Sequence, residues 1–248
     1  MTLDADQIRD LTDSLAPELI VPPLGYAADV CQACRDWTDG ATLCPKCRNA
    51  QDLLGMSPAP VVPISLYIKP SAMRDRLTFY KDPRSPANGQ FAIEVAAIFE
   101  RFFAEHTGEV AARFGDWDVA TVIPSKHAHD GPHPLHTALI ELPARSVLPL
   151  ESLLRPGGET IDRRQPAPGG FVADTSVAGR SVILLDDVYT TGATAQSAVY
   201  ALVAAGARVP AVVVAGRRLN PTAFQPVAAL VERQMASPFS FAARLWGA

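Results

Sequence analysis

Residues 182–194 read VILLDDVYTTGAT, and this stretch decides the fold expected for the chain of 248 residues. The run 182–185 is apolar without interruption, which is typical of a strand buried on both faces of a parallel sheet. Two acidic residues, Asp186 and Asp187, follow it, and a short turn leads into a helical pattern from Ala193. Because open α/β sheets bind ligands at the carboxyl ends of their strands, this order predicts a ligand site.

The residue types in this stretch predict a site for a phosphorylated sugar. Carboxylates at a strand end can accept hydrogen bonds from a sugar diol or help to hold Mg²⁺. Free N–H groups and the helix dipole at the start of the helix favour a phosphate, which Gly192 allows the backbone to approach closely. The alternative is an ordinary turn with capping threonines, which leaves the two acids unexplained. The residues expected at the phosphate are Thr190, Thr191, Gly192, Ala193 and Thr194.

Two other nucleotide sites are excluded by spacing. The stretch lacks the GxxxxGK[ST] pattern of a P-loop, and the chain lacks the GxGxxG pattern of a dinucleotide site.

Composition and charge describe a globular protein. The chain is 48% hydrophobic and 19% charged, and its formal charge of −4 gives no overall attraction to nucleic acid or anionic lipid. The N-terminal segment MTLDADQIRDLTD is acidic and lacks the basic start and apolar core of a signal peptide. No run reaches the roughly 18 apolar residues that a membrane span requires. We therefore expect a cytoplasmic protein without membrane contact.

Four cysteines form two CxxC pairs, Cys31 with Cys34 and Cys44 with Cys47. Two such turns can complete a tetrahedral thiolate site, which predicts a zinc ribbon with structural Zn²⁺ because four thiolates leave no open coordination position. A pair of redox dithiols is the alternative.

A proline-rich segment suggests where the chain divides. Residues 57–63 read SPAPVVP, and we place the boundary there. The expected organisation is an N-terminal helix and zinc ribbon over 1–58 and a main domain over 59–248.

Strands and helices are expected to alternate in the main domain, as in a parallel sheet covered by helices on both faces. The basic segment 69–82 precedes a strongly amphipathic helix, and the Gly-, Pro- and Arg-rich segment 154–170 is expected to be a long flexible loop. The expected strands are 61–68, 118–123, 181–187 and 209–215, and the expected helices are 91–110, 193–205 and 222–235.

A second loop follows the strand expected at 118–123. Ser125 and Lys126 stand at its carboxyl end, where an anion can bind. The next residues, HAHDGPHPLH, contain four histidines among glycine and proline, at positions 127, 129, 133 and 136. A surface loop is expected there, and a metal site is the alternative.

The stretch VILLDDVYTTGAT resembles the phosphoribosyl pyrophosphate (PRPP) signature of type I phosphoribosyltransferases. The wider layout resembles the ComF-like family, which is named for a competence protein. The shared features are the four-cysteine ribbon, a basic segment before a long helix, an Arg-rich loop with Gly170-Phe171, the signature, and Ala205-Gly206-Ala207. The resemblance spans roughly residues 31–217.

This resemblance implies a type I phosphoribosyltransferase-like parallel sheet flanked by helices, with a small N-terminal zinc ribbon. It implies that Asp186 and Asp187 contact the ribose hydroxyls of PRPP, that residues 190–194 bind its 5′-phosphate, and that Mg²⁺ accompanies PRPP. Pyrophosphate contacts would come from Ser125 and Lys126, and Arg163 or Arg164 would come from a mobile loop over the site. The implied catalytic set is Asp186, Asp187, Lys126 and Arg164.

The implied function belongs to nucleotide metabolism: transfer of the phosphoribosyl group to an unknown nitrogen base with release of pyrophosphate. Two alternatives stay open. One is an accessory protein of DNA uptake or processing that binds single-stranded DNA through the ribbon and Arg74, Arg76 and Lys81. The other is a PRPP sensor without turnover. A homodimer is also left open.

Overall fold

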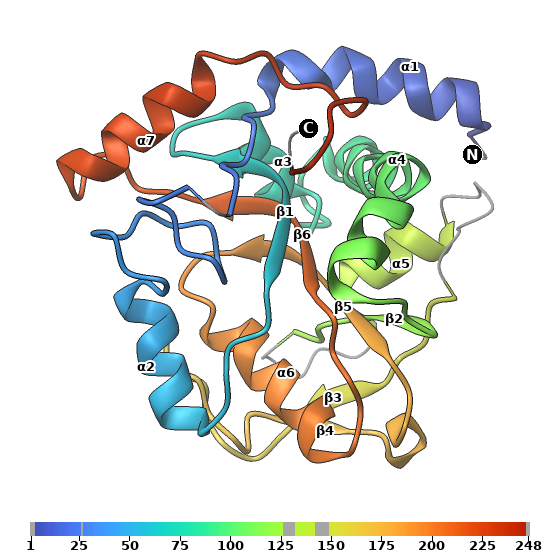
Figure 1. Ribbon diagram of the computed structural model, residues 1–248. Coiled ribbons are helices and arrows are strands. Elements are labelled where there is room, and N and C mark those ends of the chain that lie inside the picture. The colour runs from blue at the N-terminus through green and yellow to red at the C-terminus, as the bar shows by residue number, and fades with distance from the viewer. Residues whose placement is uncertain (1–2, 26, 126–131, 142–148, 247–248) are drawn as a thin grey trace.

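The computed structural model describes residues 3–25, 27–125, 132–141 and 149–246 (Figure 1). Its helices are α1 (Ala5–Leu15), α2 (Pro45–Leu54), α3 (Ala72–Phe79), α4 (Asn88–Phe114), α5 (Pro134–Glu141), α6 (Ala193–Ala204) and α7 (Gln225–Met235). Its strands are β1 (Val61–Tyr67), β2 (Val119–Val122), β3 (Leu154–Pro156), β4 (Phe171–Ala173), β5 (Val182–Tyr189) and β6 (Val212–Arg218). Two 3₁₀ turns are η1 (Ala16–Glu18) and η2 (Thr175–Val177).

The main sheet has the strand order β1-β6-β5-β2, and every neighbouring pair is parallel. Leu150 adds a parallel bridge beside Ala120 of β2. Strands β3 and β4 form a separate antiparallel pair. The predicted class, a parallel sheet flanked by helices, is confirmed.

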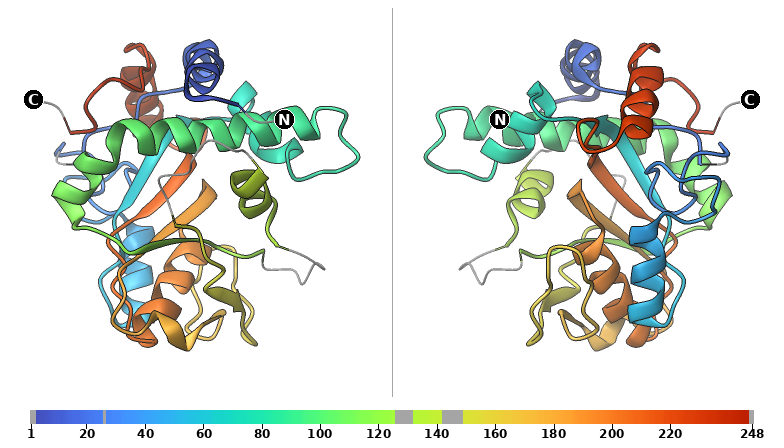
Figure 2. Two further views of the ribbon diagram at one scale, coloured as in Figure 1. Left: turned by 90° about the vertical axis from the view of Figure 1, so that its right-hand side faces the viewer. Right: turned by 90° about the vertical axis from the view of Figure 1, so that its left-hand side faces the viewer.

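Helices cover both faces of the sheet because strand side chains alternate between the faces. On β5, Ile183 and Leu185 belong to the core shared with α4, whereas Val182 and Leu184 belong to the core shared with α6. Figure 2 shows α4 lying across one face, with α1 on its outer side, and α6 and α2 on the other face. These apolar strand residues have no polar face, which is why the run at 182–185 could be recognised as buried.

The N-terminal helix packs on the main domain. Asp4 caps α1 through a reciprocal pair of hydrogen bonds with Gln7, and the buried face of α1 includes Ile8 and Leu15. Both residues join the apolar core around α4. The division at residue 58 stays a prediction, and the packing of α1 provides a way to test it.

Two elements differ from expectation. Strand β5 includes Asp186 and Asp187, as expected, but runs two residues further than the expected end at 187, to Tyr189, because its pairing with β6 continues as far as Arg217. The acids therefore lie within the strand, beyond the last residue of β2 but beside β6. The segment 154–170 is a loop over residues 157–170, but its first three residues form β3, which pairs with β4, so the loop closes a hairpin.

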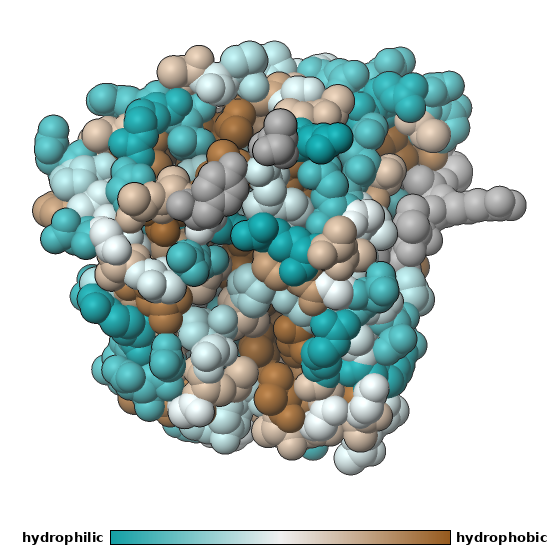
Figure 3. All heavy atoms as spheres, in the orientation of Figure 1, coloured by the Kyte–Doolittle hydropathy of each residue, from teal (hydrophilic) through white to brown (hydrophobic). Residues whose placement is uncertain are grey.

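The surface seen in Figure 3 is mostly hydrophilic, and apolar atoms show chiefly in hollows between polar side chains. Within the described ranges no helix combines the length and apolar character that crossing a bilayer requires.

Candidate functional site

A small pocket lies where β5 ends and α6 begins. Its volume is about 50 Å³, and it is lined by Asp186, Val188 and the continuous run 189–195. The first N–H groups of a helix have no partner within it and carry the positive end of its dipole. The fold thus brings Asp186 and all five predicted phosphate contacts of residues 190–194 around one space, which we call the phosphate loop pocket.

Gly192 gives this loop its shape. It caps α6 with φ +88°, in the left-handed region that side chains rarely adopt. A Cβ atom there would lie 2.1 Å from the hydroxyl oxygen of the buried Tyr189. The loop therefore rests directly on the Tyr189 ring, with no room for a side chain between them.

The two acids point to opposite sides of the sheet. Asp186 lines the phosphate loop pocket, whereas Asp187 is 2% exposed and forms an ion pair with Lys81 on the α4 side. Burial and the charge of Asp187 raise the pKa of Asp186 well above its usual value. Burial opposes ionisation of Asp187, but Lys81 outweighs it and lowers the pKa of that carboxyl. Asp187 is therefore the acid that ionises first, and a cation at Asp186 would favour ionisation of the second.

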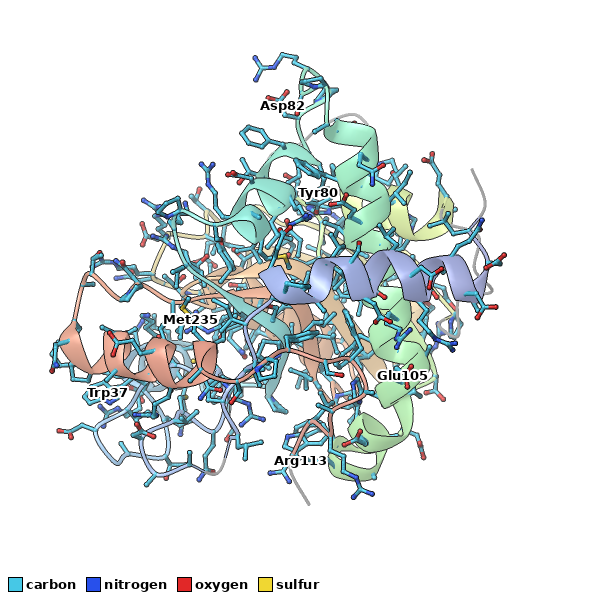
Figure 4. The ribbon with its side chains drawn as sticks, turned by 90° about the horizontal axis from the view of Figure 1, so that it is seen from above. Trp37, Tyr80, Asp82, Glu105, Arg113 and Met235 are labelled. Carbon is cyan, nitrogen blue, oxygen red and sulfur yellow. The ribbon has the colours of Figure 1, made fainter. Side chains whose placement is uncertain are left out.

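A larger groove lies on the Asp187 side. It has a volume of about 530 Å³ and is lined by Tyr80, Lys81 and residues of α4 and α5, including Asn88, Thr137 and Glu141. Tyr80 lies where α3 and α4 meet, and the loop that carries Asp82 projects beyond it (Figure 4). Burial and Asp187 raise the pKa of Tyr80 well above its usual value. The groove thus reaches the buried acid through Lys81, which lines the groove and pairs with Asp187.

The basic segment 69–82 has partners that the sequence did not reveal. Arg76 is 8% exposed and pairs with Glu18 and, at 2.5 Å, with Glu94. The prediction that Arg76 contacts DNA phosphates is wrong, because this guanidinium is buried against carboxylates. Arg74 pairs with Asp75 at 2.7 Å.

Positive charge gathers at the carboxyl ends of β1 and β6. Arg218 is the last residue of β6 and lies opposite Tyr67, the last residue of β1. Lys69 follows Tyr67 by two residues. Desolvation, and then the charges of Arg218, Arg74 and Arg163, lower the pKa of Lys69. Cations that repel one another in this way favour a ligand with several negative charges.

The hairpin between β3 and β4 carries the two arginines predicted for a mobile loop. The Thr191 hydroxyl donates to the carbonyl oxygen of Arg163 at 2.6 Å, and the Asn49 amide donates to that of Arg164 at 3.4 Å. Both arginine side chains are exposed. The hairpin is therefore docked beside the phosphate loop through its backbone, and Arg163 is the nearer of the two to that loop.

The four cysteines come together as predicted. All four sulfur atoms are buried and lie within 4.8 Å of one another, and Cys34 Sγ is 3.6 Å from Cys44 Sγ. A tetrahedral zinc site with bonds of about 2.3 Å separates its sulfur atoms by roughly 3.8 Å. The donor set and spacing fit Zn²⁺. The second CxxC turn opens α2, with Cys44 at its N-cap and Cys47 in its first turn.

The remaining site predictions fall in and around these features. Ser125 is half-buried just beyond β2, and Lys126 lies outside the described residues, as do His127 and His129. His133 is described: its Nδ1 accepts the Leu135 N–H at 3.1 Å, and burial lowers the pKa of this imidazole to about 4. The roles assigned to these residues stay predictions.

The sequence analysis assigned Lys81 to DNA, whereas its ammonium group pairs with Asp187, and it gave no role to Tyr80 or Arg217. Tyr80 and Lys81 look like an ordinary helix end, and Arg217 looks like the polar end of a strand. Their partners come from distant segments, so no local pattern could have identified them.

No protein-family model matches the chain, and no curated protein matches it in sequence. Among solved structures, it is similar to a phosphoribosyltransferase from Corynebacterium diphtheriae, with 18% identity over 71% of this chain and 94% of that one and a TM-score of 0.34. It is also similar to the orotate phosphoribosyltransferase of Mycobacterium tuberculosis H37Rv in complex with inorganic phosphate, with 16% identity, coverage of 75% and 82%, and a TM-score of 0.35. Because these scores lie below 0.5, the function proposed next rests on the geometry of this chain.

Proposed function

We propose that this chain binds PRPP with Mg²⁺ and transfers its phosphoribosyl group to an unidentified nitrogen base, releasing pyrophosphate. The observation that carries the proposal is the phosphate loop pocket, where Asp186 and residues 190–194 face one space at the N-terminus of α6. Helix N–H groups suit a 5′-phosphate, and a carboxylate beside them suits the ribose hydroxyls of the same molecule.

The surrounding charges suit the rest of this substrate. In this proposal Asp186 would help to hold Mg²⁺, which would neutralise charge on the departing pyrophosphate. The cations at the ends of β1 and β6 also suit a polyanion. Pyrophosphate contacts by Ser125 and Lys126, and a contact from Arg163 or Arg164, belong to this proposal.

The reaction would break the bond between the anomeric carbon and the pyrophosphate oxygen and form a bond to the attacking nitrogen. Positive charge develops on the sugar in between, and the departing oxygens gain negative charge. The contribution of the chain is to hold both ends of the donor in line and to stabilise the departing charge.

Calorimetry with Mg–PRPP tests the proposal directly. The double variant Asp186→Asn with Asp187→Asn should lose PRPP binding. The matched control is Asp6→Asn with Asp10→Asn, which changes the charge equally on exposed positions of α1 and should bind normally. Unchanged affinity of the Asp186→Asn, Asp187→Asn variant for Mg–PRPP would contradict the proposal.

Release of pyrophosphate with a panel of purines and pyrimidines separates transfer from binding alone. Release with one base identifies a transferase and its acceptor class. Binding without release for every base identifies a sensor. The DNA-binding alternative is weakened because Arg76, one of its three cations, is buried against Glu18 and Glu94.

A further inference from the structure

A buried guanidinium joins the four-cysteine centre to the phosphate loop. Arg217 of β6 is 0% exposed. On one side its Nε donates to the carbonyl oxygen of Cys34 at 2.8 Å, and its Nη2 donates to Asp36 Oδ2 at 2.8 Å. On the other side its Nη1 donates to the carbonyl oxygens of Thr190 at 2.8 Å and Tyr189 at 3.3 Å. A single side chain therefore spans the two sites.

The Tyr189 ring provides a second link in the same place. The Arg217 guanidinium lies 5.1 Å from the ring centroid, within the range of a cation–π contact. The hydroxyl end of the ring fills the space below Gly192. The ring is thus held between the guanidinium and the phosphate loop.

Burial makes this arrangement depend on all of its partners. A buried charge is tolerated only when it is paired and its donors are satisfied, and removing one partner leaves an uncompensated charge. Cys34 and Asp36 lie in the first CxxC turn and just after it, where a metal would hold that turn against the second. Without metal, the acceptors on that side of Arg217 are held by hydrogen bonds of the turn and by the ion pair of Asp36 with Lys46.

We infer that Arg217 is a positioning residue of the phosphate loop, and that the four-cysteine centre holds the groups that bind the other side of its guanidinium. Metal binding at the cysteines and phosphate binding at residues 190–194 then stabilise each other. The inference rests on the proposed function only for the identity of the phosphate ligand. Such coupling is reciprocal: the factor by which Zn²⁺ raises affinity for PRPP equals the factor by which PRPP raises affinity for Zn²⁺.

Hydrogen exchange of the full chain tests the coupling without any ligand. Removing Zn²⁺ with a chelator should speed exchange in a peptide covering 186–195. Arg217→Met should show this fast exchange with Zn²⁺ bound, and removal of Zn²⁺ should then add little. The control is Arg208→Met, which removes a guanidinium bonded to the carbonyl oxygens of Phe114 and Asp116 away from the loop and should leave exchange there unchanged.

Binding measurements test the reciprocity. Calorimetry should show weaker PRPP binding after Zn²⁺ removal, by about tenfold, and PRPP should raise the equilibrium affinity for Zn²⁺, measured by chelator competition, by the same factor. Both effects should vanish in Arg217→Met. If that variant does not fold, Asp36→Asn keeps Arg217 while weakening one anchor, and the coupling factor should shrink.

Two results would overturn the inference: loop exchange in the wild type that is indifferent to Zn²⁺, or coupling that survives unchanged in Arg217→Met. Absence of PRPP binding by the zinc-loaded chain would instead refute the proposed function, and the exchange experiment would still decide the coupling.

Discussion

The conformation of the phosphate loop depends on Gly192, so replacing this one residue tests directly whether the loop shape matters for stability and binding. Gly192→Ala places a methyl group against the Tyr189 hydroxyl at φ +88°. We expect a loss of about 1–3 kcal/mol in the free energy of unfolding, because both the backbone and the ring must shift. Affinity for PRPP should fall by at least about tenfold with the displaced loop, since roughly 1.4 kcal/mol corresponds to that factor.

Urea denaturation and calorimetry measure these two effects. Gly158→Ala is the matched control, because a Cβ there meets no atom within 4 Å and φ is not positive. Equal behaviour of the two variants would contradict the account of the loop.

His133 predicts a pH dependence. Its pKa is lowered to about 4 by burial, whereas an unfolded histidine titrates near about 6.5. Between these values the unfolded chain binds more protons than the folded chain, so stability falls as pH drops from about 6.5 to about 4 and is fully retained above that window. The loss amounts to no more than about 3 kcal/mol.

Urea denaturation of the wild type and of His133→Asn isolates the contribution of His133 to stability. The measurements run from pH 7.5 to pH 4.5, on either side of the unfolded pKa of about 6.5. The wild type should lose stability more steeply than the variant over that range. Parallel curves would show that His133 titrates normally.

At the scale of elements, the docking of the β3–β4 hairpin depends on Ser197 of α6. This residue is 0% exposed, accepts the Ala167 N–H at 2.9 Å and donates to the Ala193 carbonyl at 2.7 Å. Ser197→Ala leaves a buried N–H without a partner, which costs about 1–3 kcal/mol. Hydrogen exchange over 157–169 should rise in the variant. Ser14→Ala, at an exposed position of α1, should change neither quantity.

The four-cysteine centre predicts a metal content. Metal analysis should find about one Zn²⁺ per chain, and Cys44→Ser should lose it together with the order of residues 27–54, because metal binding supplies part of the folding free energy of such a unit. Circular dichroism and hydrogen exchange follow that loss. A folded protein that never contains metal would contradict the zinc assignment.

The whole molecule is expected to unfold as one unit, because α1 shares its core with α4. Ile8 is 4% exposed in that core, and Ile8→Ala should cost about 2–5 kcal/mol. Calorimetry should show one transition, shifted down by roughly 2–4 °C for each kcal/mol. Leu53→Ala, at a 46% exposed position, is the control. A main transition that does not move would instead favour the independent N-terminal unit drawn at residue 58.

Patterns among residues close together in the sequence were sufficient to predict several features of the fold and of the site. The apolar run 182–185 predicted a buried strand because burial on both faces leaves no polar position, and the spacing of the CxxC pairs predicted a cysteine cluster because each turn brings its two sulfur atoms to one side. The order of acids, glycine and helix start placed Asp186 and residues 190–194 together. All of these relations hold between residues that are neighbours along the chain.

The tertiary structure decided what those neighbours meet. The pairing of β5 with β6 extended the strand past the acids to Tyr189, and the ion pair with Lys81 fixed what Asp187 meets. The same pairing set Arg217 between Cys34 and Thr190, and so placed the cysteine centre against the phosphate loop. Strand register and the packing of distant segments fix these contacts. The residues concerned form no local pattern, so the sequence by itself specifies the chemical groups of the site and the fold determines how they are paired.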